Sequence, residues 1–156
     1  MVDWLKRYGI DEERILVDDS SKPNINDVAP DRRVICVPYH HRTPQGVEVD
    51  LKAVVTIDAH WIGVKVLLLP AALIPARARK DLLKMLLRAN FDLNEVTYSL
   101  DPDGNVHVET DMPTDTDYEN FRVEFGSVEY GLQYFTTDIS SRLQERINLR
   151  NTWMYC

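Results

Sequence analysis

The chain has 156 residues, 18 of them basic and 25 acidic, which gives a formal net charge of −7. This length predicts one domain that buries roughly 70% of the surface its unfolded chain would expose. The negative charge disfavours general binding to nucleic-acid backbones, although a local basic patch remains compatible with it. The two cysteines, Cys36 and Cys156, form neither a disulfide framework nor a zinc-ligand spacing.

The first ten residues carry charge at Asp3, Lys6 and Arg7 and lack an apolar run, so no secretory signal is expected there. The longest apolar stretch, residues 66–74, is interrupted by Pro70 and is too short for a membrane span. We therefore expect a cytoplasmic protein with reduced thiols that does not enter a membrane.

The N-terminal part is expected to hold a short helix and a long loop. Residues 2–8 predict the helix, and Gly9 ends it. The apolar run 15–17 fits either a strand or a continuation of the helical layer. Residues 18–33 are polar and contain two prolines, which predicts an exposed loop. The single domain, 1–156, thus divides into this part (1–33), a core (34–147) and a tail (148–156).

Three antiparallel strands are predicted next. The first covers residues 34–41, where Pro38 favours an edge position because proline cannot donate to a ladder. Residues 47, 49, 51, 53, 55 and 57 are apolar and residues 48, 50, 52 and 56 are polar, which predicts a strand with one buried face. The third covers 61–69; Gly63 marks a bulge or a close approach, and the continuous leucines at 67–69 predict cover on both faces.

A helix and a hairpin follow. Apolar residues recur around a polar stripe after Pro75, which predicts an amphipathic helix that begins at this proline and ends at Asn90. Two alternating runs then flank the loop 101–105, Asp-Pro-Asp-Gly-Asn, a strong hairpin signal. The loop's glycine is its fourth residue, whereas a calcium-binding EF-hand loop needs glycine at the sixth position.

The last predicted element is a long helix with one apolar stripe. Thr116 and Glu119 have capping-box spacing. Seven apolar residues follow in steps of three and four: Tyr118, Phe121, Phe125, Val128, Leu132, Phe135 and Ile139. Such a stripe must be covered. Gly126 and Gly131 predict close packing against another backbone.

Extended to Ile147, this helix would be about 45 Å long, which exceeds the width of a small domain. It therefore breaks near Thr136 and Thr137, or its end reaches a second subunit. We favour a homodimer. The aromatic tail, which includes Trp153, is expected to dock on a sheet edge, a partner's groove or its own core.

The predicted fold is α+β: a five-stranded antiparallel sheet with helices packed on it, in the order α-β-β-β-α-β-β-α. The run Leu-Leu-Arg-Ala-Asn-Phe (86–91) is followed by a strand, and the run Leu-Asp-Pro-Asp-Gly-Asn-Val (100–106) by a second strand, a proline and a long helix; this succession resembles the YbjN family. That family shares the fold of the type III secretion chaperones. The resemblance implies a small, acidic, dimeric cytosolic protein that binds another polypeptide and performs no chemistry.

Few residues suggest chemistry. His40 and His41 are adjacent on a strand and so point to opposite faces; Cys36 shares the face of His40, but no further metal ligands are identified. Edge-strand histidines are the favoured interpretation. Asp58 and His60 could form a general-base pair, although a turn-stabilising aspartate is favoured. The acidic run 111–117 suits a helix start better than a divalent cation, and no glycine-rich phosphate loop is present.

Two basic rows have i, i+4, i+8 spacing and so lie on one helix face each: Lys80, Lys84 and Arg88, and Arg142, Arg146 and Arg150. Each is interpreted as a solvated face paired with local carboxylates or, more sharply, as a docking surface for an acidic partner segment.

The favoured function is a non-enzymatic, protein-binding or chaperone-like regulatory module that acts as a homodimer without a cofactor. An edge strand at 34–41 could accept a partner by strand addition, and an apolar groove beside the sheet is a second candidate surface. The alternative is a small metal-dependent or hydrolytic enzyme that uses His40, His41, Asp58 or His60. A third is a regulatory partner of nucleic-acid machinery that uses the arginine rows. The candidate partner or dimer surface comprises Val34, Cys36, Tyr39, His41, Lys80, Lys84, Arg88, Phe125, Val128, Leu132, Phe135 and Trp153.

Overall fold

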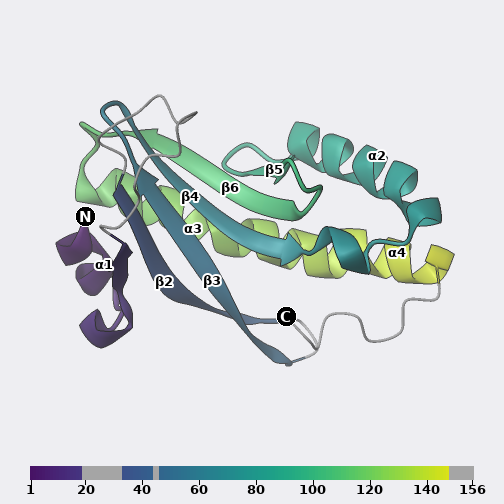
Figure 1. Ribbon diagram of the computed structural model, residues 1–156, viewed down its shortest axis with the longest axis horizontal. Coiled ribbons are helices and arrows are strands. Elements are labelled where there is room, and N and C mark those ends of the chain that lie inside the picture. The colour runs from purple at the N-terminus through teal and green to yellow at the C-terminus, as the bar shows by residue number, and fades with distance from the viewer. Residues whose placement is uncertain (19–32, 44–45, 148–156) are drawn as a thin grey trace.

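The computed structural model describes residues 1–18, 33–43 and 46–147, and they form an α+β fold (Figure 1). Six strands make one antiparallel sheet in the spatial order β1-β2-β3-β4-β6-β5. They are β1 (Leu16–Asp18), β2 (Arg33–Arg42), β3 (Glu48–Ile57), β4 (Trp61–Leu69), β5 (Thr97–Leu100) and β6 (Val106–Pro113). The five predicted strands are all present. The sixth, β1, settles the open interpretation of residues 15–17 as a strand.

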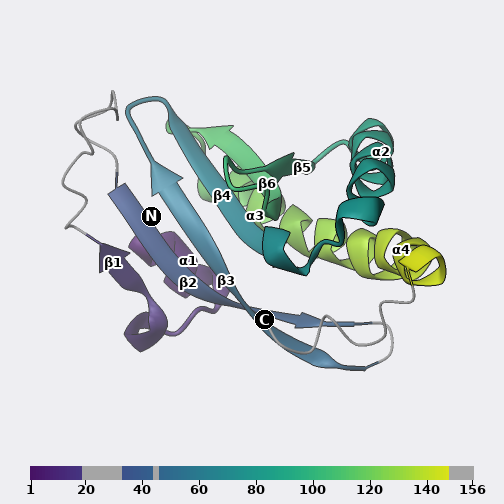
Figure 2. The same ribbon diagram turned by 45° about the vertical axis from the view of Figure 1, so that its right-hand side comes forward.

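The helices are α1 (Val2–Tyr8), α2 (Ala76–Asp92), α3 (Tyr118–Tyr134) and α4 (Ser140–Ile147), with a π-helical turn (Phe135–Ile139) joining α3 to α4. Helix α3 runs along one face of the sheet and contacts β4 and β6 (Figure 1). Helix α2 contacts β5 and α4, and these two helices lie together at the end of the molecule away from α1 (Figure 2).

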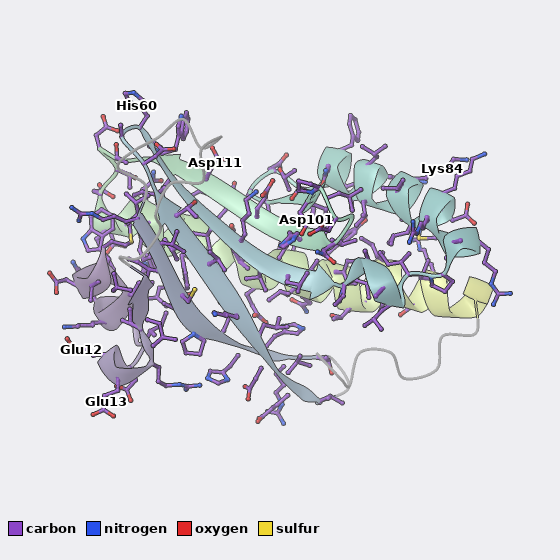
Figure 3. The ribbon with its side chains drawn as sticks, in the orientation of Figure 1. Glu12, Glu13, His60, Lys84, Asp101 and Asp111 are labelled. Carbon is purple, nitrogen blue, oxygen red and sulfur yellow. The ribbon has the colours of Figure 1, made fainter. Side chains whose placement is uncertain are left out.

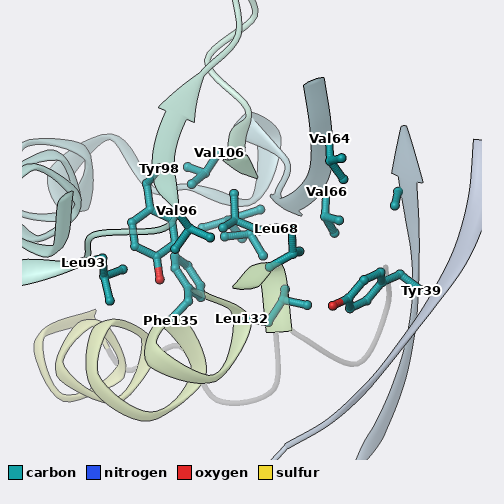
Figure 4. Packing of buried hydrophobic residues seen from close by; sticks show 14 of the residues in the cluster. Tyr39, Val64, Val66, Leu68, Leu93, Val96, Tyr98, Val106, Leu132 and Phe135 are labelled. Carbon is teal, nitrogen blue, oxygen red and sulfur yellow. The ribbon is translucent and has the colours of Figure 1, made fainter. Parts of the chain in front are cut away.

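The apolar stripe of the last helix is covered, as predicted. Its members from Phe121 to Ile139 are buried, and Tyr118 is half-buried against them. Figure 4 shows Leu132 and Phe135 packed among side chains of the sheet such as Val66 and Tyr98. Each such side chain contributes roughly 1.5–3 kcal/mol when fully buried. The chain's own sheet supplies this cover, so the stripe by itself does not require a second subunit.

The helical run from 118 to 147 widens at the predicted position. The π-helical turn contains Thr136 and Thr137, whose hydroxyls donate to backbone carbonyls one turn back, at 3.1 Å (Leu132) and 2.9 Å (Gln133). Hydroxyl groups that bond back to the helix in this way compete with the regular backbone ladder. The helix is therefore locally widened instead of interrupted.

The N-terminal segment is part of the core, so the predicted boundary at residue 34 was too late. Leu5 is fully buried, and the Trp4 and Tyr8 rings lie 5.4 Å and 4.8 Å from those of Phe121 and Phe125 on α3. Aromatic pairs at these distances add to the free energy gained by burial alone. Strand β1 then pairs with β2 and ties this segment to the sheet.

Both predicted ends of α2 were wrong. Pro75 precedes the helix as its N-cap, with extended backbone angles, and Ala76 is the first helical residue. At the other end the helix passes Asn90 and stops at Asp92, where Leu93 is extended. Asn90 does not adopt the left-handed conformation because its side chain has another role: its Nδ2 donates to the Tyr98 carbonyl at 2.9 Å, and its Oδ1 accepts from the Tyr98 N–H at 2.7 Å.

The predicted capping box at Thr116 was also wrong by one residue. Asp117 is the N-cap of α3, and its carboxylate accepts from the backbone N–H of Asn120 at 2.8 Å. An ionised cap is favourable at the positive end of the helix dipole. Thr116 instead accepts from the Asn120 side chain.

The end of β4 explains its continuous leucines. The pairing with β6 shifts register between Leu67 and Leu69, so Leu68 and Leu69 are both buried while Leu67 is exposed. A bulge, and not cover on both faces, accounts for the sequence. Gly63 is a close approach: a Cβ there would lie 3.0 Å from Thr56 Oγ1. Gly131 is close to side chains of Val96 and Val108, not to a backbone as predicted.

Candidate functional site

Strands β2 and β3 extend beyond the rest of the sheet. Strand β1 pairs with β2 at Val34–Cys36, and the pairing of β4 with β3 begins at Ala53. The paired segments 37–42 and 48–52, which we call the arm, therefore have no strand on either outer side among the residues that the structure describes. Figure 1 and Figure 2 show these ends of β2 and β3 projecting past β4. Unpaired strand edges present rows of N–H and C=O groups that can pair with another chain.

One face of the arm is anchored on α3. Tyr39 is buried, and its ring lies 5.7 Å from that of Phe125. Burial raises the pKa of the Tyr39 phenol above its usual value, so it stays neutral. His41 is 2% exposed, and its Nδ1 donates to a carboxylate oxygen of Glu129 at 2.8 Å. The Nε2 of His41 is buried and has no hydrogen-bond partner among the described residues.

The other face of the arm carries an exposed polar chain of three residues. Arg14 donates to His40 Nε2 at 2.9 Å, and His40 Nδ1 lies 2.5 Å from Asp50 Oδ1. Because a guanidinium group can donate but not accept, Arg14 is the donor in its contact with His40. His40 thus links a cation to a carboxylate across β2 and β3.

The residues of the enzyme hypothesis do not come together. His40 and His41 point to opposite faces of β2, as predicted, since one is exposed and the other buried. Asp58 lies eight residues from Asp50 along β3, roughly 26 Å at 3.3 Å per residue. Its Oδ1 accepts from the backbone N–H groups of His60 and Trp61, both at 2.8 Å, which is the turn-stabilising role. His60 is exposed at this turn (Figure 3).

No cluster of three or more histidine, cysteine or carboxylate side chains that could hold a metal ion occurs within residues 1–18, 33–43 and 46–147. Cys36 is half-buried, whereas Cys156 lies outside the described residues. The acidic run 111–117 includes Asp117, the N-cap of α3 described above.

The loop between β5 and β6 is a hydrogen-bonded turn, as predicted. Asp101 Oδ1 accepts from the N–H groups of Asp103 (3.0 Å) and Asn105 (2.9 Å), and Oδ2 accepts from the Asn105 amide at 2.7 Å. His107 Nε2 lies 3.2 Å from the same Oδ2. The Asn105 side chain, followed by its backbone and His107, lowers the pKa of Asp101 to about 2. This carboxylate organises the turn.

Helix α2 exposes an apolar row that sequence reasoning missed. Leu83, Leu87 and Phe91 are 40%, 70% and 88% exposed, whereas Leu82 and Leu86 are buried. The sequence places apolar residues around most of this helix, so its pattern alone does not separate the covered side from the open one. The spacing of i, i+4 and i+8 could have identified the row.

The first basic row lies alongside it. Lys80, Lys84 and Arg88 are exposed, and they form no ion pair within the described part of the chain. Figure 3 shows Lys84 pointing away from the molecule. Within the described ranges, the row is thus solvated and is not paired with local carboxylates. Of the second row, Arg142 lies 3.8 Å from Asp138; the side chain of Arg146 and all of Arg150 lie outside the described residues.

The remaining predicted surface residues divide into three groups. Phe125, Val128, Leu132 and Phe135 are buried against the sheet, so the prediction that they form a surface was wrong for this chain. These four residues cover the sheet face beside which the apolar groove was predicted. Val34 and Cys36 are half-buried on the paired part of β2. Trp153 and the tail lie outside the described residues.

Comparison with known proteins gives no assignment: a scan against protein-family models and a search of curated proteins both found no match. Within the described ranges, no helix is both long and apolar enough to cross a membrane.

Proposed function

We propose that this protein is a non-catalytic, chaperone-like binding module that acts as a homodimer and takes up an extended segment of another polypeptide. The observation that supports this function is the arm, whose two outer edges carry no strand among the described residues. An exposed edge of this kind accepts an extended chain by strand addition. The resemblance to the YbjN family and the type III secretion chaperones, carried by residues 86–106, points the same way.

The two edges of the arm differ in chemistry. The β2 edge, residues 37–42, contains Pro38, which removes one donor. The β3 edge, residues 48–52, has the sequence Glu-Val-Asp-Leu-Lys and retains every N–H. We assign the β3 edge to the homodimer and the β2 edge to the partner polypeptide.

The β3 edge is self-complementary. In an antiparallel pairing about a two-fold axis at Asp50, Glu48 lies opposite the partner subunit's Lys52, and Val49 lies opposite the partner subunit's Leu51. Closed two-fold symmetry is the commonest arrangement of soluble oligomers. Two Asp50 carboxylates would meet at the axis, and each has the Arg14–His40 chain beside it to offset their repulsion.

The homodimer is tested by a charge swap on this edge. Glu48→Lys alone or Lys52→Glu alone places like charges opposite each other at both symmetric pairs. Each single variant should weaken the dimer about tenfold or more, since cross-strand charge pairs contribute roughly 0.2–1 kcal/mol each. The double variant Glu48→Lys/Lys52→Glu restores opposite charges and should recover the dimer. Light scattering after size-exclusion chromatography measures the mass.

A wild-type protein that is strictly monomeric at micromolar concentration would remove the homodimer from the proposal. Three variants that all dimerise like wild type would remove the β3 edge. Partner binding is tested separately by capture from the native lysate with wild type and with Tyr39→Pro or His40→Pro on the β2 edge. At least one of these neighbouring substitutions removes an outward N–H, so unchanged capture by both would exclude this edge.

A further inference from the structure

The outer face of α2 carries two parallel rows of side chains. The apolar row is Leu83, Leu87 and Phe91, and the basic row is Lys80, Lys84 and Arg88. Each basic residue stands three positions before an apolar one, so the rows run side by side along two turns of the helix. The opposite side of α2, with Ala78, Leu82, Leu86 and Ala89, is the side buried in the core.

The apolar row is more exposed than packing of α2 on its own domain requires. Phe91 is 88% exposed and Leu87 is 70% exposed. Single exposed apolar residues are normal, but three in register on one helix make a contiguous patch, and such patches mark interaction sites. The covered side of α2 already provides the apolar stripe that holds the helix in place.

Charge identifies what kind of partner would fit. Helix α2 contains five basic residues (Arg77, Arg79, Lys80, Lys84 and Arg88) and two acidic ones (Asp81 and Asp92), a net charge of +3 from 5 − 2. The whole chain carries −7, so the remainder carries −10. The outer face is thus a local basic region on an acidic protein, and a basic region favours an acidic partner both in encounter and in orientation.

We propose that the outer face of α2 binds an acidic amphipathic helix of another protein. Apolar side chains of that helix pack between Leu83, Leu87 and Phe91, at the 8–10 Å axial separation usual for packed helices. Glu and Asp residues along its flank pair with the basic row, as flanking charges do in coiled coils. A second copy of this chain fits poorly, because an isologous α2–α2 contact would bring +3 against +3.

This surface goes beyond the function proposed for the arm. It lies on another element, it takes a helix and not an extended strand, and it does not depend on the outcome at the β3 edge. A variant with a disrupted arm, such as Glu48→Lys, should bind the helix as wild type does. The two proposals can therefore fail separately.

The test uses a designed helical peptide as probe. It has about 20 residues, about 30 Å of helix, with Leu on one face and Glu on both flanks; a matched peptide has Lys in place of every Glu. Fluorescence anisotropy measures both against the full chain. The acidic peptide should bind at least about tenfold more tightly than the basic one, and the difference should shrink between about 0.05 M and about 0.5 M salt.

Two variants locate the site. Leu87→Ser/Phe91→Ser should weaken the acidic peptide about tenfold or more, whereas Val123→Ser, a control at an exposed residue of α3, should not. Lys84→Glu/Arg88→Glu should reverse the preference so that the basic peptide binds more tightly, a result that unfolding cannot produce. Equal binding of the two peptides by wild type, or unchanged binding by Leu87→Ser/Phe91→Ser, would overturn the proposal. So would a wild-type dimer that Leu87→Ser/Phe91→Ser dissociates, because the face would then join two copies.

Discussion

The hydroxyl of Tyr98 donates a hydrogen bond of 2.6 Å to the backbone carbonyl of Gly131, which joins the edge strand β5 to the last turn of α3. Burial raises the pKa of this phenol, so it remains a donor. The contact requires the helix to lie close to the sheet, and a glycine on the helix allows that approach. A Cβ at Gly131 would be 2.6 Å from Val108 Cγ2 and 3.0 Å from Val96 Cγ2.

Gly131→Ala should therefore destabilise the protein by up to about 2 kcal/mol. Overpacking costs roughly 1–3 kcal/mol, and it exceeds the gain of about 1 kcal/mol that alanine brings to a helix. Gly126→Ala is the matched control on the same helix, where the new Cβ would be 3.4 Å from the Tyr8 hydroxyl. That variant should be neutral or more stable by up to about 1 kcal/mol. Urea unfolding measures both, and a shift of equal sign and size in the two variants would contradict the close approach.

Asn90 holds β5 to α2 through both backbone groups of Tyr98. Asn90→Ala should cost about 1–3 kcal/mol of unfolding free energy, because it leaves a donor and an acceptor without partners. Asn94→Ala, at an exposed residue just after the same helix, should change stability by no more than about 0.5 kcal/mol. Equal effects of the two substitutions would show that the bridge to Tyr98 does not stabilise the fold.

The buried His41 depends on Glu129. Glu129→Ala should cost about 1–3 kcal/mol, since it leaves the His41 Nδ1–H buried without its acceptor. In a His41→Phe background the same substitution should cost much less, because no buried donor remains. A double-mutant cycle measured by chemical unfolding gives this coupling. Additive effects would mean that the pair is not energetically linked.

The Asp101 turn predicts a dependence of stability on pH. Hydrogen bonds from Asn105 lower the folded-state pKa of Asp101 from 3.8 to about 2. A lowered carboxyl pKa means that the folded state binds protons less readily than the unfolded state. The stabilisation is therefore complete above about pH 4 and is lost as the pH falls towards 2.

The substitution Asp101→Asn should reduce this dependence of folding stability on pH. The unfolding midpoint of wild type should exceed that of the variant at pH 6, and the difference should shrink steadily between about pH 4 and about pH 2. Asp103→Asn, an exposed residue of the same loop, serves as the control. A wild-type advantage that stays constant down to pH 2 would contradict the role of the Asp101 carboxylate.

Periodic patterns predicted the main elements because those patterns reflect local contacts. The alternation of residues 47–57 identified β3, and the steps of three and four from Tyr118 identified α3 and its covered stripe. Strand β1 was left open because three residues are too few to show a period. Asn90 was misinterpreted because its partner, Tyr98, is on the next strand, and helix-end preferences do not include such a contact.

The candidate site was harder to predict than the fold. The arm exists because β1 begins only at Leu16, opposite Cys36, and β4 pairs with β3 only from Ala53, and no local pattern encodes where a neighbouring strand begins or ends. The edge position predicted from Pro38 was wrong, because β2 is an interior strand whose residues 34–36 pair with β1; its outer side at Pro38 has no partner strand among the described residues. The sequence did not reveal the exposed apolar row of α2. Its leucines, Leu83 and Leu87, are of the same residue type as the buried Leu82 and Leu86 and differ from them only in exposure.

The central claim is that the edges of the arm pair with other chains, and amide hydrogen exchange of the arm tests it most directly. Exchange is measured by NMR at low and at high protein concentration. The outward N–H groups of residues 48–52 should exchange quickly when the protein is dilute and should become protected as it is concentrated, while those of β4 stay protected throughout. Outward amides at 48–52 that exchange equally fast at every concentration would contradict the homodimer that we propose.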